Sequence, residues 1–100
     1  GILEKLRPTP RWKHADPSVR AVAVYELGSE DGEALRALAR DDADPRVRRA
    51  AVTRLDDIAV LADVARTDPD EDVRVEAVRG LAGLAAEADD VSDAAESVRQ

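Results

Sequence analysis

The 100-residue sequence contains no cysteine, methionine or phenylalanine, and its only aromatic residues are Trp12 and Tyr25. Without cysteine the chain can form neither a disulfide nor a thiolate zinc site, and it has no thiol for catalysis. His14 is the only histidine, which excludes a histidine-based metal site as well. The core must therefore consist of alanine, leucine and valine, which suit helices that pack closely and repetitively. A cysteine-free chain is compatible with the cytoplasm, and we expect a cytoplasmic location.

Long apolar runs are lacking too. No segment approaches the length that crosses a bilayer, and no signal-peptide pattern is present, so we expect no membrane contact. Positive charge is also scarce, with 15 Lys and Arg against 22 Asp and Glu and a net charge of −7. This balance argues against non-specific binding of nucleic acid by the chain as a whole.

A short recurring segment is the most informative feature of the sequence. The pattern Asp-Pro-x-Val-Arg occurs at residues 16–20 and 44–48, and a variant, Asp-Glu-Asp-Val-Arg, follows at residues 70–74. Each copy continues into alanine, valine and leucine at the same offsets. A unit that recurs after 28 and then 26 residues is typical of stacked supersecondary units rather than of one globular core.

The apolar residues of each copy predict a helix. In the middle copy Val47 is followed by Ala51, Val52 and Leu55, a spacing that places the four side chains on one helical face. An aspartate stands directly before each stripe, where its carboxylate can accept the first free backbone N–H groups. Proline follows it in two copies, at the first helical position, where the missing N–H costs nothing.

A second kind of helix precedes each copy. An apolar and basic set recurs 12, 9, 8 and 7 residues before Val47 and before Val73, and it predicts first helices that end near Arg40 and Arg66. The predicted fold class is all-α, a short right-handed α-solenoid of about three two-helix repeats. The expected boundaries are 1–15 for an N-terminal cap, 16–29 for the second helix of the first repeat, 30–55 and 56–83 for the second and third repeats, and 84–100 for a C-terminal cap or the start of a truncated fourth repeat.

The two ends depart from the repeat pattern. We interpret Trp12 as an apolar lid over the first repeat, and the apolar stretch at residues 2–6 as one helical turn. The two glycines within residues 80–83 predict either close packing or a helix break. Residues 93–99 line up with the start of a further second helix. We expect the chain to be a fragment of a longer protein, with a degenerate capping helix at a natural C-terminus as the alternative.

Residues 12–81 carry the pattern Asp-Pro-x-Val-Arg-x-x-Ala-Val-x-x-Leu on their second helices, and this pattern resembles the HEAT repeat, especially its short bacterial HEAT-like kind. The resemblance implies that the second helices line a concave side and the first helices a convex side. It also implies a ladder in which each motif arginine reaches the aspartate-bearing turn of a neighbouring repeat. The implied ladder residues are Arg20, Arg48 and Arg74, with Asp16, Asp44 and Asp70.

Candidate binding residues are the second-helix positions that differ between the copies. On the second helix of the middle repeat these positions are basic. On the second helix of the first repeat, which flanks it on one side, they include a Tyr/Val apolar patch. The combination would suit an acidic or amphipathic helix of a partner. The predicted partner-binding residues on the concave face are Arg46, Arg49, Arg54, Tyr25 and Arg79. The alternative is an ordinary solvated face, on which Arg54 pairs with Asp56 or Asp57.

The predicted function is a non-catalytic protein-interaction or scaffold module, without cofactor, metal or catalytic residues. Its expected partner is a protein or another segment of its own longer chain. One alternative is a nucleic-acid-binding module that uses the basic middle helix, although the sequence offers no aromatic ladder for base stacking. A second alternative is an accessory subunit of a lyase-type HEAT-like enzyme. The acidic turn at residues 68–72 begins like a calcium loop but lacks the glycine and glutamate of an EF-hand, so we assign it to helix capping.

Overall fold

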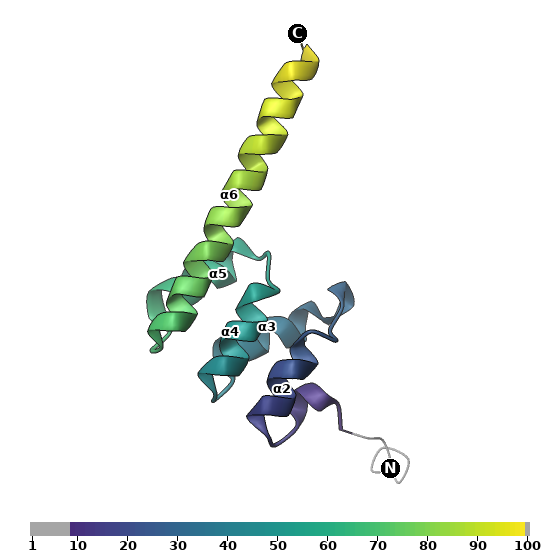
Figure 1. The fold of residues 1–100 in the computed structure, drawn as a ribbon, viewed down its shortest axis with the longest axis vertical. Helices are drawn as coiled ribbons and strands as arrows, with labels where there is room; N and C mark the ends of the chain where they lie inside the picture. The colour runs from purple at the N-terminus through teal and green to yellow at the C-terminus, as the bar shows by residue number, and fades with distance from the viewer. Residues whose placement is uncertain (1–8, 100) are drawn as a thin grey trace.

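The protein is an elongated stack of helices that measures 64 × 32 × 19 Å (Figure 1). The computed structural model describes the backbone of residues 9–99 and the side chains of residues 9–91. Every regular element of this part of the chain is helical. The elements are η1 (Arg11–Lys13), α2 (Pro17–Val24), η2 (Ser29–Asp31), α3 (Gly32–Asp41), α4 (Pro45–Thr53), α5 (Ile58–Thr67) and α6 (Glu71–Arg99). The helical turn expected at residues 2–6 lies outside the described residues.

The second helices begin where their capping residues predict. Asp16 accepts a hydrogen bond from the backbone N–H of Ser18 at 2.8 Å, and Asp44 accepts one from Arg46 at the same distance. Asp70 caps α6 by accepting from the N–H of Val73 at 3.1 Å. Each carboxylate satisfies a donor that has no partner inside its helix and meets the positive end of the helix dipole.

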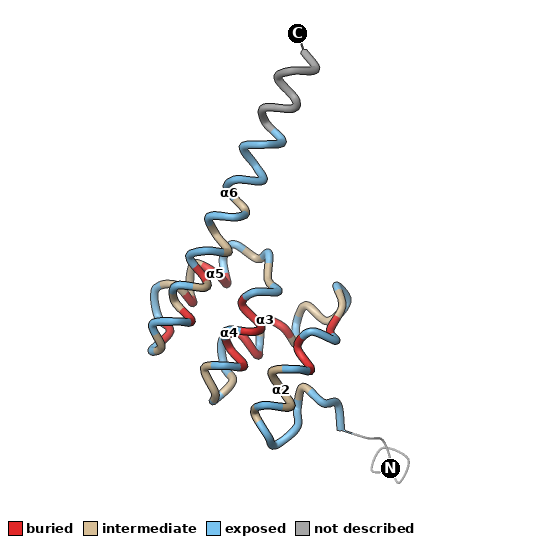
Figure 2. The backbone as a smooth tube through the Cα atoms, viewed as in Figure 1, coloured by how far each residue is buried: buried red, intermediate tan, exposed pale blue. Residues whose placement is uncertain are grey.

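The helices form two layers. The second helices α2, α4 and α6 pack side by side in one layer, and the first helices α3 and α5 contact each other in the second layer (Figure 1). Buried residues lie where the layers meet (Figure 2). This arrangement is a short helical solenoid, as the recurring units predict.

The core repeats with the sequence, except at its last unit. Val24 and Val52 occupy equivalent positions in the first two repeats and are 0% and 1% exposed. Val78 occupies the same position in α6, and the sequence pattern predicts that it is buried as well, but it is 54% exposed. The difference arises because the valine of each earlier repeat is covered by the repeat that follows, whereas no later repeat lies over α6 within the described residues.

Helix α6 is longer than the sequence pattern predicts. It runs unbroken for 29 residues, so the helix break expected near Gly80 and Gly83 is absent, as is the new helix start expected at residues 93–99. The other expectation for the glycines, close packing, is confirmed at Gly80. A Cβ atom at Gly80 would lie 3.3 Å from Cδ1 of the fully buried Leu61, whereas one at Gly83 would meet nothing within 4 Å.

Arginines tie each second helix to the turn of the next repeat. Arg48 donates to the Asp68 carboxylate from Nε at 2.9 Å and from Nη2 at 3.2 Å. Arg20 binds Asp42 in the same bidentate way, at 2.9 and 3.0 Å, and this contact raises the pKa of the Arg20 guanidinium above its ordinary value. The structure thus shows a ladder but corrects its carboxylates, which stand two residues before the helix-capping aspartates. The capping aspartates are turned toward their own helices.

The turns that contain Asp42 and Asp68 share a second hydrogen bond, from a ladder arginine to a backbone carbonyl. The backbone carbonyl of Asp42 accepts from Nη1 of Arg48 at 2.8 Å, and that of Asp68 accepts from Nη1 of Arg74 at the same distance. Each ladder arginine therefore holds the turn before its own helix. Arg20 and Arg48 also hold the turn of the next repeat.

His14 takes the place of the ladder aspartate in the first turn. Its carbonyl accepts from Nη1 of Arg20 at 2.8 Å, and its Nδ1 accepts from the backbone N–H of Asp16 at 2.9 Å. The Oδ1 atom of Asp42 accepts from the equivalent N–H, that of Asp44, at 3.0 Å. No arginine of a preceding repeat meets His14 within the described residues, so no carboxylate is required there.

Trp12 covers the start of the stack. It lies in η1, is partly buried and packs against the hydrophobic core. The Nζ atom of Lys13 lies 5.0 Å from the centre of the Trp12 ring, within the range of a cation–π contact. An exposed ion pair between Arg11 and Glu26 joins η1 to the end of α2. These contacts agree with the interpretation of Trp12 as a lid over the first repeat.

Candidate functional site

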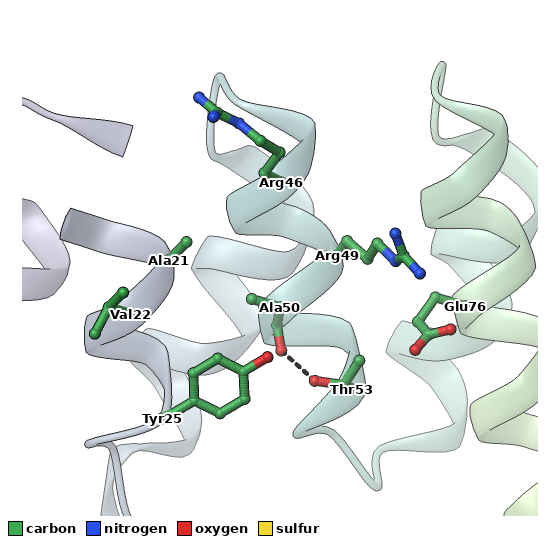
Figure 3. Close-up of a pocket in the computed structure, with 8 residues that line it drawn as sticks. All are labelled: Ala21, Val22, Tyr25, Arg46, Arg49, Ala50, Thr53 and Glu76. Atoms are coloured by element: carbon green, nitrogen blue, oxygen red, sulfur yellow. Dashed lines mark hydrogen bonds between the residues drawn. The ribbon is translucent and has the colours of Figure 1, made fainter. Parts of the chain in front are cut away.

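A shallow groove lies on the surface that α2, α4 and α6 form together (Figure 3). It has a volume of about 410 Å³ and lies mainly between α2 and α4. We call it the second-helix groove. Its lining residues are Ala21, Val22 and Tyr25 from α2 and its C-cap, Arg46, Arg49, Ala50 and Thr53 from α4, and Glu76 from α6.

Side-chain size at equivalent repeat positions explains the hollow. Val22, Ala50 and Glu76 occupy the same position in three successive second helices. Ala50 contributes only a methyl group, so α4 leaves space between the longer side chains of its two neighbours. Figure 3 shows Tyr25 extending from the end of α2 toward Thr53 on α4, where it borders the hollow.

The α2 side of the groove is apolar and open to solvent. Val22 is 55% exposed and Tyr25 is 63% exposed. Scattered apolar residues are normal on a protein surface, but these two are neighbours that border the same hollow. Tyrosine is also enriched at protein interfaces, since its ring buries a large area and keeps a polar end.

The α4 side of the groove is basic, and its two arginines differ in their surroundings. Arg46 is held by Asp44, to which it donates from Nε at 3.1 Å and from Nη2 at 2.9 Å. The side-chain hydrogen bonds from Arg46, followed by its backbone N–H, lower the pKa of Asp44 from 3.8 to about 2, and the pKa of Arg46 is raised in return. Arg49 takes part in no ion pair among the described residues. Arg49 is therefore the cation whose charge is least compensated in the groove.

A carboxylate closes the groove on the α6 side. The Glu76 side chain is only 18% exposed, and its Oε2 lies 3.9 Å from Nη1 of Arg79, one turn further along α6. Figure 3 shows Arg49 extending from α4 toward the side on which Glu76 lies. The groove thus combines an apolar wall, a cationic wall and one carboxylate, which suits a ligand with apolar and charged groups on the same face.

Three of the five predicted partner-binding residues come together here. Tyr25, Arg46 and Arg49 line the groove, as expected for residues on one surface. Arg79 lies on α6 outside the lining, with a side chain that is 72% exposed. The fifth residue, Arg54, does not line the groove, so its predicted place on the binding surface is wrong.

Arg54 contributes to the stack instead of lining the groove. Its Nη2 donates to the carbonyl of Leu27 at 2.6 Å, and its Nη1 donates to the carbonyl of Val24 at 3.2 Å. Val24 ends α2, so the guanidinium meets the negative end of the helix dipole and also holds the segment that follows the helix as far as Leu27. Arg54 also forms no ion pair with Asp56 or Asp57, so the alternative expected for it is not observed either.

The predicted set omits five of the lining residues, namely Ala21, Val22, Ala50, Thr53 and Glu76. All five lie in repeat positions that differ between copies, which was the signal used for the arginines. Ala50 carries a further signal in the sequence. It is smaller than Val22 and Glu76, which occupy the equivalent positions of the neighbouring repeats, and a small side chain between two larger ones leaves a hollow. Thr53 is held in place by a hydrogen bond from its Oγ1 to the carbonyl of Ala50 at 2.6 Å.

The residues that the structure describes hold no group of three or more histidines, aspartates and glutamates arranged to bind a metal ion. None of their helices is long and apolar enough to cross a membrane.

Comparison with known proteins gives one match. A family model described as HEAT repeats matches residues 9–82. Neither the curated proteins nor the solved structures gave a match. The matched segment begins just before the Trp12 lid and ends within α6, so it contains both ladder ion pairs and the whole lining of the groove. The match covers most of the sequence and all three copies of the motif, and the chain therefore belongs to the HEAT-repeat family.

Proposed function

We propose that the chain is a non-catalytic interaction module that holds a segment of a partner protein in the second-helix groove. HEAT repeats are commonly protein-interaction scaffolds and are generally non-catalytic. The observation that carries the proposal is the exposed pair Val22 and Tyr25, which stands across the groove from Arg49. An amphipathic segment with an acidic side chain would cover the apolar wall and bring its carboxylate to the arginine.

The charge of the groove favours a protein over a nucleic acid. Phosphate-backbone binding requires several uncompensated cations along one surface. In this groove Asp44 offsets Arg46, and one carboxylate, Glu76, also lines the surface, so Arg49 is the one lining cation without an ion pair among the described residues. An isolated acidic side chain on an apolar segment fits this distribution better than a row of phosphates. A cytoplasmic location, expected from the sequence, is part of the same proposal.

Peptide display against the intact chain tests the proposal. We expect selected peptides to combine apolar residues with aspartate or glutamate. Their affinity should fall at least about tenfold, equivalent to 1.4 kcal/mol, in Arg49→Glu and in Val22→Asp. Arg79→Glu serves as the matched control, because Arg79 is an exposed arginine of the same surface that does not line the groove. Peptides without acidic residues, or equal losses in Arg49→Glu and Arg79→Glu, would contradict the proposal.

A further inference from the structure

The second half of α6 projects beyond the stack as a single helix. Helix α5 packs along the first turns of α6, and the later turns extend away from the other elements (Figure 1). Figure 2 shows the described residues of this projection as almost entirely exposed. We call the part of α6 from residue 85 onward the arm.

An apolar stripe runs without interruption from the core into the arm. Its residues alternate in steps of four and three, which is the heptad spacing of helices that pair along their length. The stripe leaves the core gradually: its first member is fully buried, the next two are partly buried against the core, and the last two are exposed. These five residues are Ala77, Leu81, Leu84, Ala88 and Val91.

Exposure at the end of the stripe is high for residues of this kind. Val91 is 70% exposed, the largest value among the exposed large hydrophobic residues of the described chain. The same four-and-three spacing continues in the sequence at Ala95 and Val98. A 3.5-residue repeat follows one face of a straight helix only approximately and keeps facing a partner when two helices wrap around each other at a shallow angle. The spacing of the stripe is therefore suited to packing against another helix along its length.

Among the described side chains of the arm, the two aspartates lie away from the stripe. At about 100° per residue, Asp89 and Asp90 lie roughly 120° and 140° around the helix from the centre of the stripe. Glu87 lies nearer, at about 80°, and Ala85 borders the stripe on the opposite side at a similar angle. A helix with cationic side chains would find few carboxylates beside the stripe. An identical acidic helix, by contrast, can approach it with most of its own carboxylates turned outward.

We infer that the arm pairs with the arm of a second copy of this chain, stripe against stripe. Such an interface is self-complementary, as the contact of a two-fold dimer requires. Ala88 lies midway between Leu84 and Val91 on the stripe, at the centre of the contact. When the two arms run parallel and in register, Ala88 of one copy faces Ala88 of the other. The contact extends the packing that Leu81 and Leu84 already make at the base of the arm.

Disulfide trapping tests the contact, because the chain has no cysteine of its own. We expect Ala88→Cys to form a disulfide-linked dimer on mild oxidation. Ala86→Cys is the matched control: Ala86 is equally an exposed alanine of the arm, but it lies about 180° from the stripe. Equal crosslinking of the two variants, or none at Ala88→Cys, would overturn the inference.

Sedimentation equilibrium from micromolar to millimolar concentration provides an independent measurement. The wild-type chain should show a concentration-dependent dimer, Ala88→Arg should remove it, and Ala88→Leu should strengthen it at least about tenfold, since it buries additional apolar area. Ala86→Arg and Ala86→Leu should leave the dimer unchanged. A wild-type chain that stays monomeric throughout would overturn the inference and leave the stripe for a helix of a different protein. Circular dichroism of each variant checks that the helices persist.

Discussion

Arg48 of α4 and Asp68 of the following turn form a bidentate ion pair whose side chains are only 10% and 4% exposed. Burying two charges is costly, so such a pair adds little compared with an apolar pair of the same volume. Its importance is that neither partner can be removed without leaving the other charge buried and unpaired. The pair also fixes register, since the guanidinium spans the carboxylate of the next turn and the carbonyl of its own.

Arg54 should prove to be a structural residue. Arg54→Ala removes two hydrogen bonds to the carbonyls of Val24 and Leu27, and the free energy of unfolding should fall by about 2 kcal/mol. Arg79→Ala removes only an exposed contact to Glu76 and should cost less than about 0.5 kcal/mol. Urea unfolding followed by circular dichroism measures both. Equal costs in the two variants would show that Arg54 does not hold the end of α2.

Acid should destabilise the fold in part through Asp44. Its folded-state pKa is lowered to about 2 from an ordinary value of 3.8, so the unfolded chain takes up the proton first. The stabilisation is therefore fully present above about pH 4 and is lost as the pH falls toward about 2. Asp44→Asn keeps a good helix cap but does not titrate, so its free energy of unfolding should fall less over this interval. Parallel curves for the variant and the wild type would contradict the assignment.

The two glycines of α6 should respond differently to alanine. Gly83→Ala places a methyl group in open space and should raise the free energy of unfolding by about 1 kcal/mol through helix propensity. Gly80→Ala gains the same propensity, but its Cβ would press on Leu61 at 3.3 Å, so its net gain should be smaller. Thermal unfolding of the two single variants compares them directly. A gain for Gly80→Ala that equals or exceeds the gain for Gly83→Ala would mean that the close contact with Leu61 costs nothing.

Local chemistry explains why much of the fold could be predicted. The capping aspartates, the Pro residues that follow two of them and the spacing of Val47, Ala51 and Val52 all act within one helix, so the sequence displays them directly. Recurrence then fixed the order of the helices. The turn that receives each ladder arginine was implied by the resemblance to HEAT repeats. Which of its carboxylates binds the arginine did not follow from the repeat, because both positions carry aspartate and only the geometry of the turn separates them.

The remaining differences depend on neighbours that a local pattern does not contain. Val78 matches Val24 and Val52 in sequence, but its burial depends on what covers α6. The length of α6 was missed because glycine is tolerated inside a helix when its surroundings favour it, and the residues that follow are mostly good helix formers. Arg54 was assigned to a partner because its spacing places it off the apolar stripe. Its length, however, lets it reach back to the end of α2.

We claim that the recurring ladder arginines hold the stack together, whereas the groove is lined by positions that differ between the repeats. Arg48 and Arg49 are adjacent arginines of α4 that represent these two roles, so their alanine variants test the distinction most directly. Chemical unfolding should show a loss of about 3–5 kcal/mol for Arg48→Ala, which leaves Asp68 buried and unpaired. It should show a change within about 0.5 kcal/mol for Arg49→Ala. A loss for Arg49→Ala that equals or exceeds the loss for Arg48→Ala would contradict the claim.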